Sequence, residues 1–324
     1  MPLCPYCNAR PQDSDDHVFP ASLGGRRTIR ACKAGCNDRF GHGFEAAVAD
    51  DLSPVAVLLS LCGLKLPRRF VWRQAFKDPS TGLDYDLESE GKVLRLSAPK
   101  VERNERGEVV RGTFRDTKEA ERARASLEEK ASGKQYRVRS TREEIKAPPL
   151  NRIQFTIGTE IRRLAVKVAI GATELVLPGV PIVAPTTRAY LLSGEASEVP
   201  VRIDYRQLDG LDGMRPPLAH LVFVEGNPKQ HLCYAIVQFF ETIQLWILLS
   251  SAYDGPAFAV LGTCNVLSNE EMFVETPGLG LDEAPRYNQQ EQVQTGVEAW
   301  AKKLDKQVRE AFGENILNFE IESN

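Results

Sequence analysis

The stretch from Cys4 to Glu45, CPYCNARPQDSDDHVFPASLGGRRTIRACKAGCNDRFGHGFE, decides the fold of the N-terminal part of this chain. It holds two close thiol pairs, Cys4 with Cys7 and Cys32 with Cys36, and 24 residues separate the pairs. Two such pairs joined by a short insert are what a tetrahedral zinc site requires. A redox-active pair is the alternative, but that normally opens a helix after a strand, and no strand precedes Cys4. The spacing therefore predicts a structural Zn²⁺ held by four thiolates.

The remaining cysteines and the hydropathy pattern indicate where the protein works. Cys62, Cys233 and Cys264 stand in apolar stretches and read as small buried hydrophobic residues. The N-terminus has neither the basic nor the apolar segment of a secretory signal, and no apolar run reaches the roughly 18 residues that cross a bilayer. We therefore expect a cytoplasmic protein with no disulfide framework and no membrane partner.

The charge is unevenly distributed along the 324 residues. The net charge of -3 sorts into -1 for residues 1–64, +6 for residues 65–150 and -8 for residues 151–324. The near-neutral total excludes a uniformly basic, histone-like protein, but it leaves room for a local basic surface. Length and charge together predict three parts: an N-terminal module (1–64), a basic middle region (65–150) and a C-terminal domain (151–324).

The insert between the thiol pairs has its own order of elements. Asp16-His17-Val18-Phe19-Pro20 predicts the start of a strand with a carboxylate and an imidazole side by side. Leu23-Gly24-Gly25 predicts a turn, 28–32 the return strand, and the segment from Asn37 onward a helix that begins beside Cys36. The expected order is strand, turn, strand and helix, with a thiol pair at each end.

This ordered set resembles the HNH endonuclease family, whose site is the ββα-metal fold. The resemblance covers about 45 residues, and it rests on the two thiol pairs together with Asp16-His17-Val18-Phe19-Pro20, Leu23-Gly24-Gly25, Asn37 after the last cysteine, and Phe40-Gly41. It implies that Asp16 and Asn37 bind one divalent cation, Mg²⁺ or Mn²⁺, and that His17 is the general base for phosphodiester hydrolysis. It also implies DNA as the substrate.

Two features depart from the family pattern. Three residues separate Cys32 from Cys36 where the family usually has two, so that turn has to bulge, and Gly35 suits a bulge. The family's middle asparagine is absent, and its place falls at Arg27 or Thr28. Thr28 offers part of the missing hydrogen bond.

Simpler interpretations exist for the candidate residues. Asp16 has acidic neighbours and reads alone as a solvated acid, and Asn37 is a favoured helix cap. Glu45, two helical turns beyond Asn37, is either a further metal ligand or a surface acid. The basic residues around the insert form either a solvated surface or phosphate contacts, and beside a phosphodiester-cleaving site we favour phosphate contacts; they are Arg26, Arg27, Arg30, Lys33 and Arg39.

The rest of the chain predicts an α+β architecture. In the middle region, 70–76 and 92–96 read as strands, and 116–130 reads as a polar helix. In the C-terminal domain, helical spacing predicts a core helix over 157–177. Four β-rich runs follow, at 221–224, 232–240, 243–249 and 258–261, which predict an antiparallel meander against that helix. An amphipathic helix is expected at 290–312, and 146–150 is the expected linker.

The leading interpretation is a metal-dependent HNH endonuclease that cuts DNA, of the kind used in bacterial restriction or anti-phage defence. The alternative is a zinc-stabilised nucleic-acid-binding module with weak or lost catalysis. The C-terminal domain resembles no family on its residues, and homodimerisation is one role expected for it. Mg²⁺-dependent cleavage distinguishes the two interpretations.

Overall fold

The computed structural model describes residues 2–61, 69–77, 82–89, 94–107, 109–114, 117–130, 157–196, 198–204, 206, 211, 219–240, 243–265, 268 and 270–281. Both predicted domain boundaries, the expected linker at 146–150, Cys62 and the expected helix at 290–312 lie outside these residues. The described part is a mixed helix and sheet structure, as the sequence predicts.

The N-terminal module is a two-stranded hairpin followed by short helices. Its elements are β1 (Ser14–His17), the 3₁₀ turn η1 (Ala21–Leu23), β2 (Thr28–Ala31), the π-helical turn η2 (Lys33–Asn37), α1 (Asp38–His42), α2 (Phe44–Asp51) and α3 (Ser53–Leu61). Gly24 adopts a φ of +96° at the turn, a conformation in which a side chain would be strained. The strand, turn, strand and helix order follows the sequence expectation.

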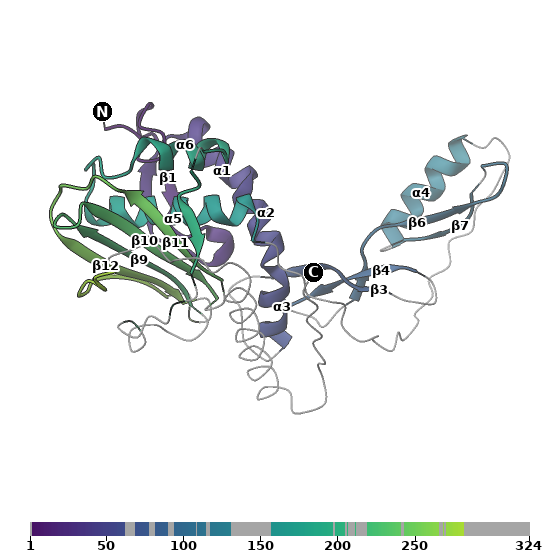
Figure 1. Ribbon diagram of the computed structural model, residues 1–324. Helices are drawn as coiled ribbons and strands as arrows, with labels where there is room; N and C mark the ends of the chain where they lie inside the picture. The colour runs from purple at the N-terminus through teal and green to yellow at the C-terminus, as the bar shows by residue number, and fades with distance from the viewer. Residues whose placement is uncertain are drawn as a thin grey trace, which may run out of the picture.

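The middle region forms two small sheets and a helix. β3 (Val71–Lys77), β4 (Asp84–Glu88) and β5 (Leu94–Leu96) make one antiparallel sheet, while β6 (Lys100–Arg103) and β7 (Val109–Thr113) make a hairpin that precedes α4 (Thr117–Lys130) in the chain. Figure 1 shows these elements on the far side of α3 from the main body of the protein. Phe70 and Trp72 are buried, so these two aromatics pack as core rather than stand ready to stack on bases.

The C-terminal part is built on one six-stranded antiparallel sheet. In spatial order it runs β13 (Glu270–Glu275), β12 (Phe258–Asn265), β9 (His220–Asn227), β10 (Leu232–Phe239), β11 (Ile243–Ser250) and β8 (Val201–Ile203). β12 pairs with β9 instead of continuing the expected meander beside β11, because β8 already occupies that edge of β11. Two helices accompany the sheet, α5 (Thr159–Val176) and α6 (Pro185–Ser193). Among the described residues, no helix combines the length and apolarity needed to span a bilayer.

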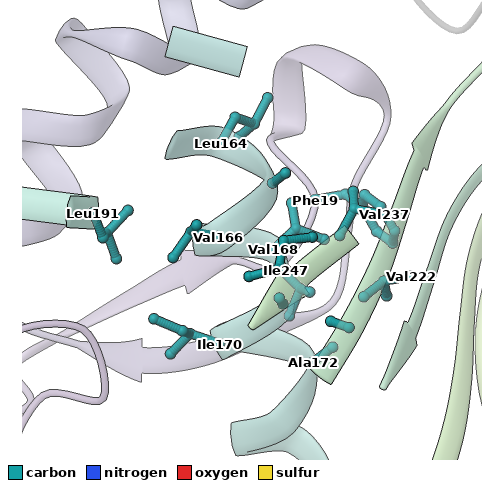
Figure 2. Packing of buried hydrophobic residues seen from close by; sticks show 14 of the residues in the cluster. Phe19, Leu164, Val166, Val168, Ile170, Ala172, Leu191, Val222, Val237 and Ile247 are labelled. Carbon is teal, nitrogen blue, oxygen red and sulfur yellow. The ribbon is translucent and has the colours of Figure 1, made fainter. Parts of the chain in front are cut away.

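Helix α5 lies between the β1–β2 hairpin and the six-stranded sheet. Every residue from Leu164 to Thr173 is buried, so this segment has no solvent-facing side. One hydrophobic cluster takes in residues of the N-terminal module, α5, α6 and the sheet. Figure 2 shows Phe19 of the hairpin loop gathered with Val168 of α5 and with Val237 and Ile247 of the sheet. The N-terminal module and the sheet therefore share a single core.

A shared core predicts that damage to α5 destabilises the hairpin and the sheet together. We expect Val168→Ala, at a side chain that is 0% exposed, to lower the free energy of unfolding by about 2 kcal/mol, through lost apolar burial and the cavity left behind. Urea unfolding measures the loss. Hydrogen exchange, read by mass spectrometry on peptides covering β2 and β11, should accelerate by the same factor in both.

The matched control is Val110→Ala, whose side chain is 63% exposed and which should change little. Faster exchange in β11 with unchanged exchange in β2 would contradict the shared core.

Candidate metal centre and active site

The four paired cysteines converge on one point. Their sulfur atoms all lie within 4.8 Å of one another, and they are the one such group of His, Cys, Asp and Glu found among the described residues. The Sγ atoms of Cys7 and Cys32 are 3.8 Å apart. A tetrahedron with zinc–sulfur bonds of about 2.3 Å has edges of about 3.8 Å, so the Cys7–Cys32 pair already stands at zinc-binding separation and the other sulfurs lie close to it.

Two local turns bring the thiols together. At the N-terminus, the backbone N–H of Asn8 donates to the backbone carbonyl of Cys4, which closes a turn around the first pair. In the second pair, the backbone N–H of Asn37 donates to the backbone carbonyl of Cys32, five residues earlier. This bond defines a π-helical turn. This turn accommodates the extra residue in the pair. A Cβ on Gly35 would lie 2.9 Å from Cys32 Sγ, so glycine suits the position.

The pKa values of the thiols indicate that all four would be deprotonated together only with a cation bound. The hydrogen bond with Cys36 lowers the pKa of Cys4 to about 5, and the same bond raises the pKa of Cys36 above its ordinary range. Burial raises the pKa of Cys32 to about 11. Four thiols this close lose their protons together only when a cation neutralises them, and a four-sulfur set is typical of structural Zn²⁺. The donor set fits zinc, which would cross-link the N-terminus to the start of α1.

The β1–β2 hairpin presents Asp16 and His17 on opposite faces. Asp16 pairs with Ile29, and both are buried, whereas His17 pairs with the exposed Thr28. Neighbouring residues in a strand point to opposite sides, so Asp16 turns toward α5 and the partly exposed His17 turns away from it. The cross-strand position of Thr28 puts it next to His17, at the place expected for the family's middle asparagine.

Asp16 meets a cation that belongs to the chain itself. Lys167 of α5 is fully buried, and its Nζ lies 3.1 Å from Asp16 Oδ1. The same ammonium donates to the backbone carbonyl of His17. It also lies 2.9 Å from Oε1 of Glu45, in an ion pair that is not an aligned hydrogen bond. Burial raises the pKa of Glu45, and Lys167 opposes that rise.

Part of this buried cluster is left without hydrogen bonds. Asp16 Oδ2 and the Tyr6 hydroxyl are both buried and make no well-formed hydrogen bond among the described residues, although the two side chains interact with each other. Burial raises the pKa of Tyr6 well above its usual value, and the charge of Asp16 adds to that rise. Unpartnered buried oxygens are uncommon in proteins, and they cluster at functional sites.

The side-chain amide nitrogen of Asn37 binds to strand β1 of the hairpin. Its Nδ2 donates to the carbonyl of Asp15 over 2.7 Å and to Ser14 Oγ over 3.2 Å. Asn37 is also the residue before α1, but its side chain makes no capping hydrogen bond there. It therefore ties the start of α1 to β1.

All five candidate phosphate-binding residues are exposed, at Arg26, Arg27, Arg30, Lys33 and Arg39. The Arg26 and Arg27 amides donate to the Glu271 carboxylate of β13, which fixes the hairpin loop to the sheet edge. Two of the side chains already have partners within the chain: Arg30 forms an exposed ion pair with Asp15, and Arg39 donates to the carbonyl of Leu192.

One comparison with known proteins identifies this arrangement. Residues 4–53 match the HNH endonuclease family model. The match confirms the resemblance and covers the hairpin, both thiol pairs and the helices through α2. No curated protein and no solved structure matches the chain. We call residues 4–53 the HNH module.

The arrangement around Asp16 does not fit the divalent cation that the family implies there. Mg²⁺ usually keeps several waters and takes its oxygen ligands at about 2.0–2.1 Å. The Asp16 side chain is only 5% exposed, and its Oδ1 is paired with Lys167. Metal ligation by Asp16, Asn37 and Glu45 stays a prediction.

Sequence reasoning missed Lys167, although a signal was present. The residue interrupts an apolar run between Val166 and Val168, and it stands three positions after the buried Leu164, on the face predicted to be core. A lone cation at a core position requires a buried carboxylate partner. The remaining histidines do not join the site: His42 is exposed on α1, His220 is buried among phenylalanine rings, and His231 sits in a turn.

The cysteine geometry predicts about one tightly bound zinc per chain. Cys36→Ala should reduce the zinc content to a small fraction of that value and destabilise the module, because three sulfurs no longer close the tetrahedral shell. Elemental analysis of the purified protein measures the zinc.

The matched control is Cys264→Ala, at another buried cysteine, which should keep its zinc. A folded native protein that contains no zinc would refute the assignment.

Proposed function

We propose that this protein is an HNH-type endonuclease that hydrolyses phosphodiester bonds in DNA, with His17 as the general base. The observation that carries the proposal is the position of His17 within the matched module. It stands on the hairpin face that turns away from the core, with the exposed Arg26, Arg27 and Arg30 on the same hairpin.

The chemistry of hydrolysis suits this face. A neutral imidazole takes a proton from water near neutral pH, and a partly exposed one is accessible to a bound phosphate. Arginine side chains on the same hairpin offer charge to the DNA backbone, which positions the strand without reading its sequence. Thr28 is the cross-strand partner of His17, and we expect its hydroxyl to help orient the imidazole.

One structural observation favours the alternative, a zinc-stabilised nucleic-acid-binding module with weak or lost catalysis. The carboxylate that the family uses for its metal is paired with Lys167 instead. In that case the zinc centre and the basic hairpin would support DNA binding without cleavage. Cleavage itself separates the two functions.

The finer parts of the proposal rest on expectations from the sequence. A bacterial restriction or anti-phage role is an analogy with other proteins in which a nuclease module is joined to an unrelated domain. A cytoplasmic location agrees with the free thiols of the six described cysteines. Homodimerisation through residues 151–324 stays a prediction.

His17→Ala should abolish plasmid cleavage, with a loss of at least about 10²-fold, because the variant lacks the imidazole proposed to accept the proton from water. The measurement is plasmid cleavage with Mg²⁺, Mn²⁺ or EDTA, on modified and unmodified DNA. Zinc content and circular dichroism should match the parent, because His17 does not belong to the core.

His42→Ala is the matched control, since His42 is an exposed histidine of the same module. It should cut at the parental rate. Equal cleavage by the His17 variant and an active parent would refute the general-base assignment. The alternative would be supported if the parent and Lys167→Met, which lacks the cation beside Asp16, both bind DNA without cutting it.

Arg27→Ala should weaken DNA binding and make it less sensitive to salt. Each lost phosphate contact lowers the slope of log affinity against log salt by about 0.9. The control is Arg202→Ala, an exposed arginine on β8 at the opposite sheet edge from β13. Fluorescence anisotropy across a salt series measures both. Identical slopes for the two variants would remove Arg27 from the interface.

A further inference from the structure

Three oxygen atoms of the HNH module surround the ammonium of Lys167. They are Asp16 Oδ1 at 3.1 Å, Glu45 Oε1 at 2.9 Å and the backbone carbonyl of His17. Two carboxylates and a carbonyl form the kind of oxygen set that proteins offer to hard divalent cations. Here the cation at their centre is a side chain from a helix about 150 residues further along the chain.

This ammonium is held with little freedom. The Lys167 side chain is 0% exposed, Asp16 is 5% exposed and Glu45 is 12% exposed. Its helix is buried along the whole segment from Leu164 to Thr173. Lys167 is therefore enclosed between α5 and the HNH module, and we expect its release from the carboxylates to require movement of α5.

The lysine and a divalent cation compete for the same carboxylate. A metal ion bound to Asp16 would lie within a few ångströms of the ammonium, and two cations at that separation in a poorly solvated site repel strongly. The Asp16 carboxylate also interacts with the buried Tyr6 side chain, and its Oδ2 makes no well-formed hydrogen bond among the described residues. With both carboxylates ionised, the three side chains carry one net negative charge.

We propose that Lys167 is an internal cation that closes Asp16 to divalent metal, so that α5 holds the HNH module in a metal-excluding state. The inference rests on the proposed function for the role of Asp16 as the expected ligand. It assigns a task to the C-terminal part of the chain, because α5 is fixed between the hairpin and the sheet. Displacement of α5 would free Asp16 and Glu45 as a pair of carboxylate ligands.

The test compares Mn²⁺ binding by the full-length, zinc-loaded native protein and its variants, using electron paramagnetic resonance of free Mn²⁺. Native protein and Asp16→Asn should bind Mn²⁺ equally weakly. Lys167→Met, which keeps the length and helix preference of the side chain, should gain at least about 10-fold in affinity. The gain should vanish in Lys167→Met combined with Asp16→Asn.

Thermal unfolding gives a second readout of the same competition. Lys167→Met leaves two buried carboxylates without their cation, so it should melt lower than the parent, and Mn²⁺ should restore part of the loss. The parent should show no comparable Mn²⁺ shift. Arg162→Met is the matched control, a cation of the same helix that is not buried, and it should behave like the parent.

Tight Mn²⁺ binding by native protein that is lost in Asp16→Asn would overturn the proposal, and so would a folded Lys167→Met variant with parental affinity. The comparison of native protein with Asp16→Asn leaves Lys167 in place. It can therefore overturn the proposal even if Lys167→Met fails to fold. Cleavage is recorded separately on the same proteins. Absence of cleavage throughout would refute the proposed function while leaving the binding result to judge Lys167.

Discussion

Helix α5 has to bury its entire circumference, and the rest of the described main body follows from that requirement. A helix with ten consecutive buried residues needs partners on every side. The six-stranded sheet supplies one side, and the HNH module with α6 supplies the others. The module matched to a nuclease family is therefore part of the same hydrophobic core as the C-terminal sheet. We expect a small rearrangement on one side of α5 to shift the residues packed on its other side, because close-packed interiors transmit strain.

The buried lysine is understandable within this arrangement. Isolated charges are expensive to bury, so Lys167 requires Asp16 and Glu45, and they require it. Such a triad contributes little net stability compared with apolar residues of similar volume, but loss of one member leaves the others uncompensated. It thus fixes one relative position of α5 and the hairpin. A zinc ion held by the four thiols would link the N-terminus to the turn that joins the return strand to α1.

The sequence was most informative where chemistry is local. Thiol spacing and the Gly24-Gly25 turn predicted the hairpin and its zinc site, and apolar runs predicted the strands that became β9 to β12. The short strand β8 and the charged strand β13 carry too few apolar residues to stand out, and both gain their order from pairing with longer neighbours. The pairing of β12 with β9 depends on which edge was free, which no local pattern encodes. The partners of Lys167 were hidden for the same reason, since Asp16 lies 151 residues away.

The two departures from the family pattern lie in the hairpin and in the second thiol pair. At the place of the absent middle asparagine, Thr28 is the cross-strand partner of His17. The extra residue between Cys32 and Cys36 is absorbed by a π-helical turn that leaves the sulfurs together. The decisive difference is the cation beside Asp16, which comes from outside the matched residues. If Lys167 acts as proposed, the position of α5 controls whether Asp16 can bind a metal ion, so the HNH module and α5 form one functional unit.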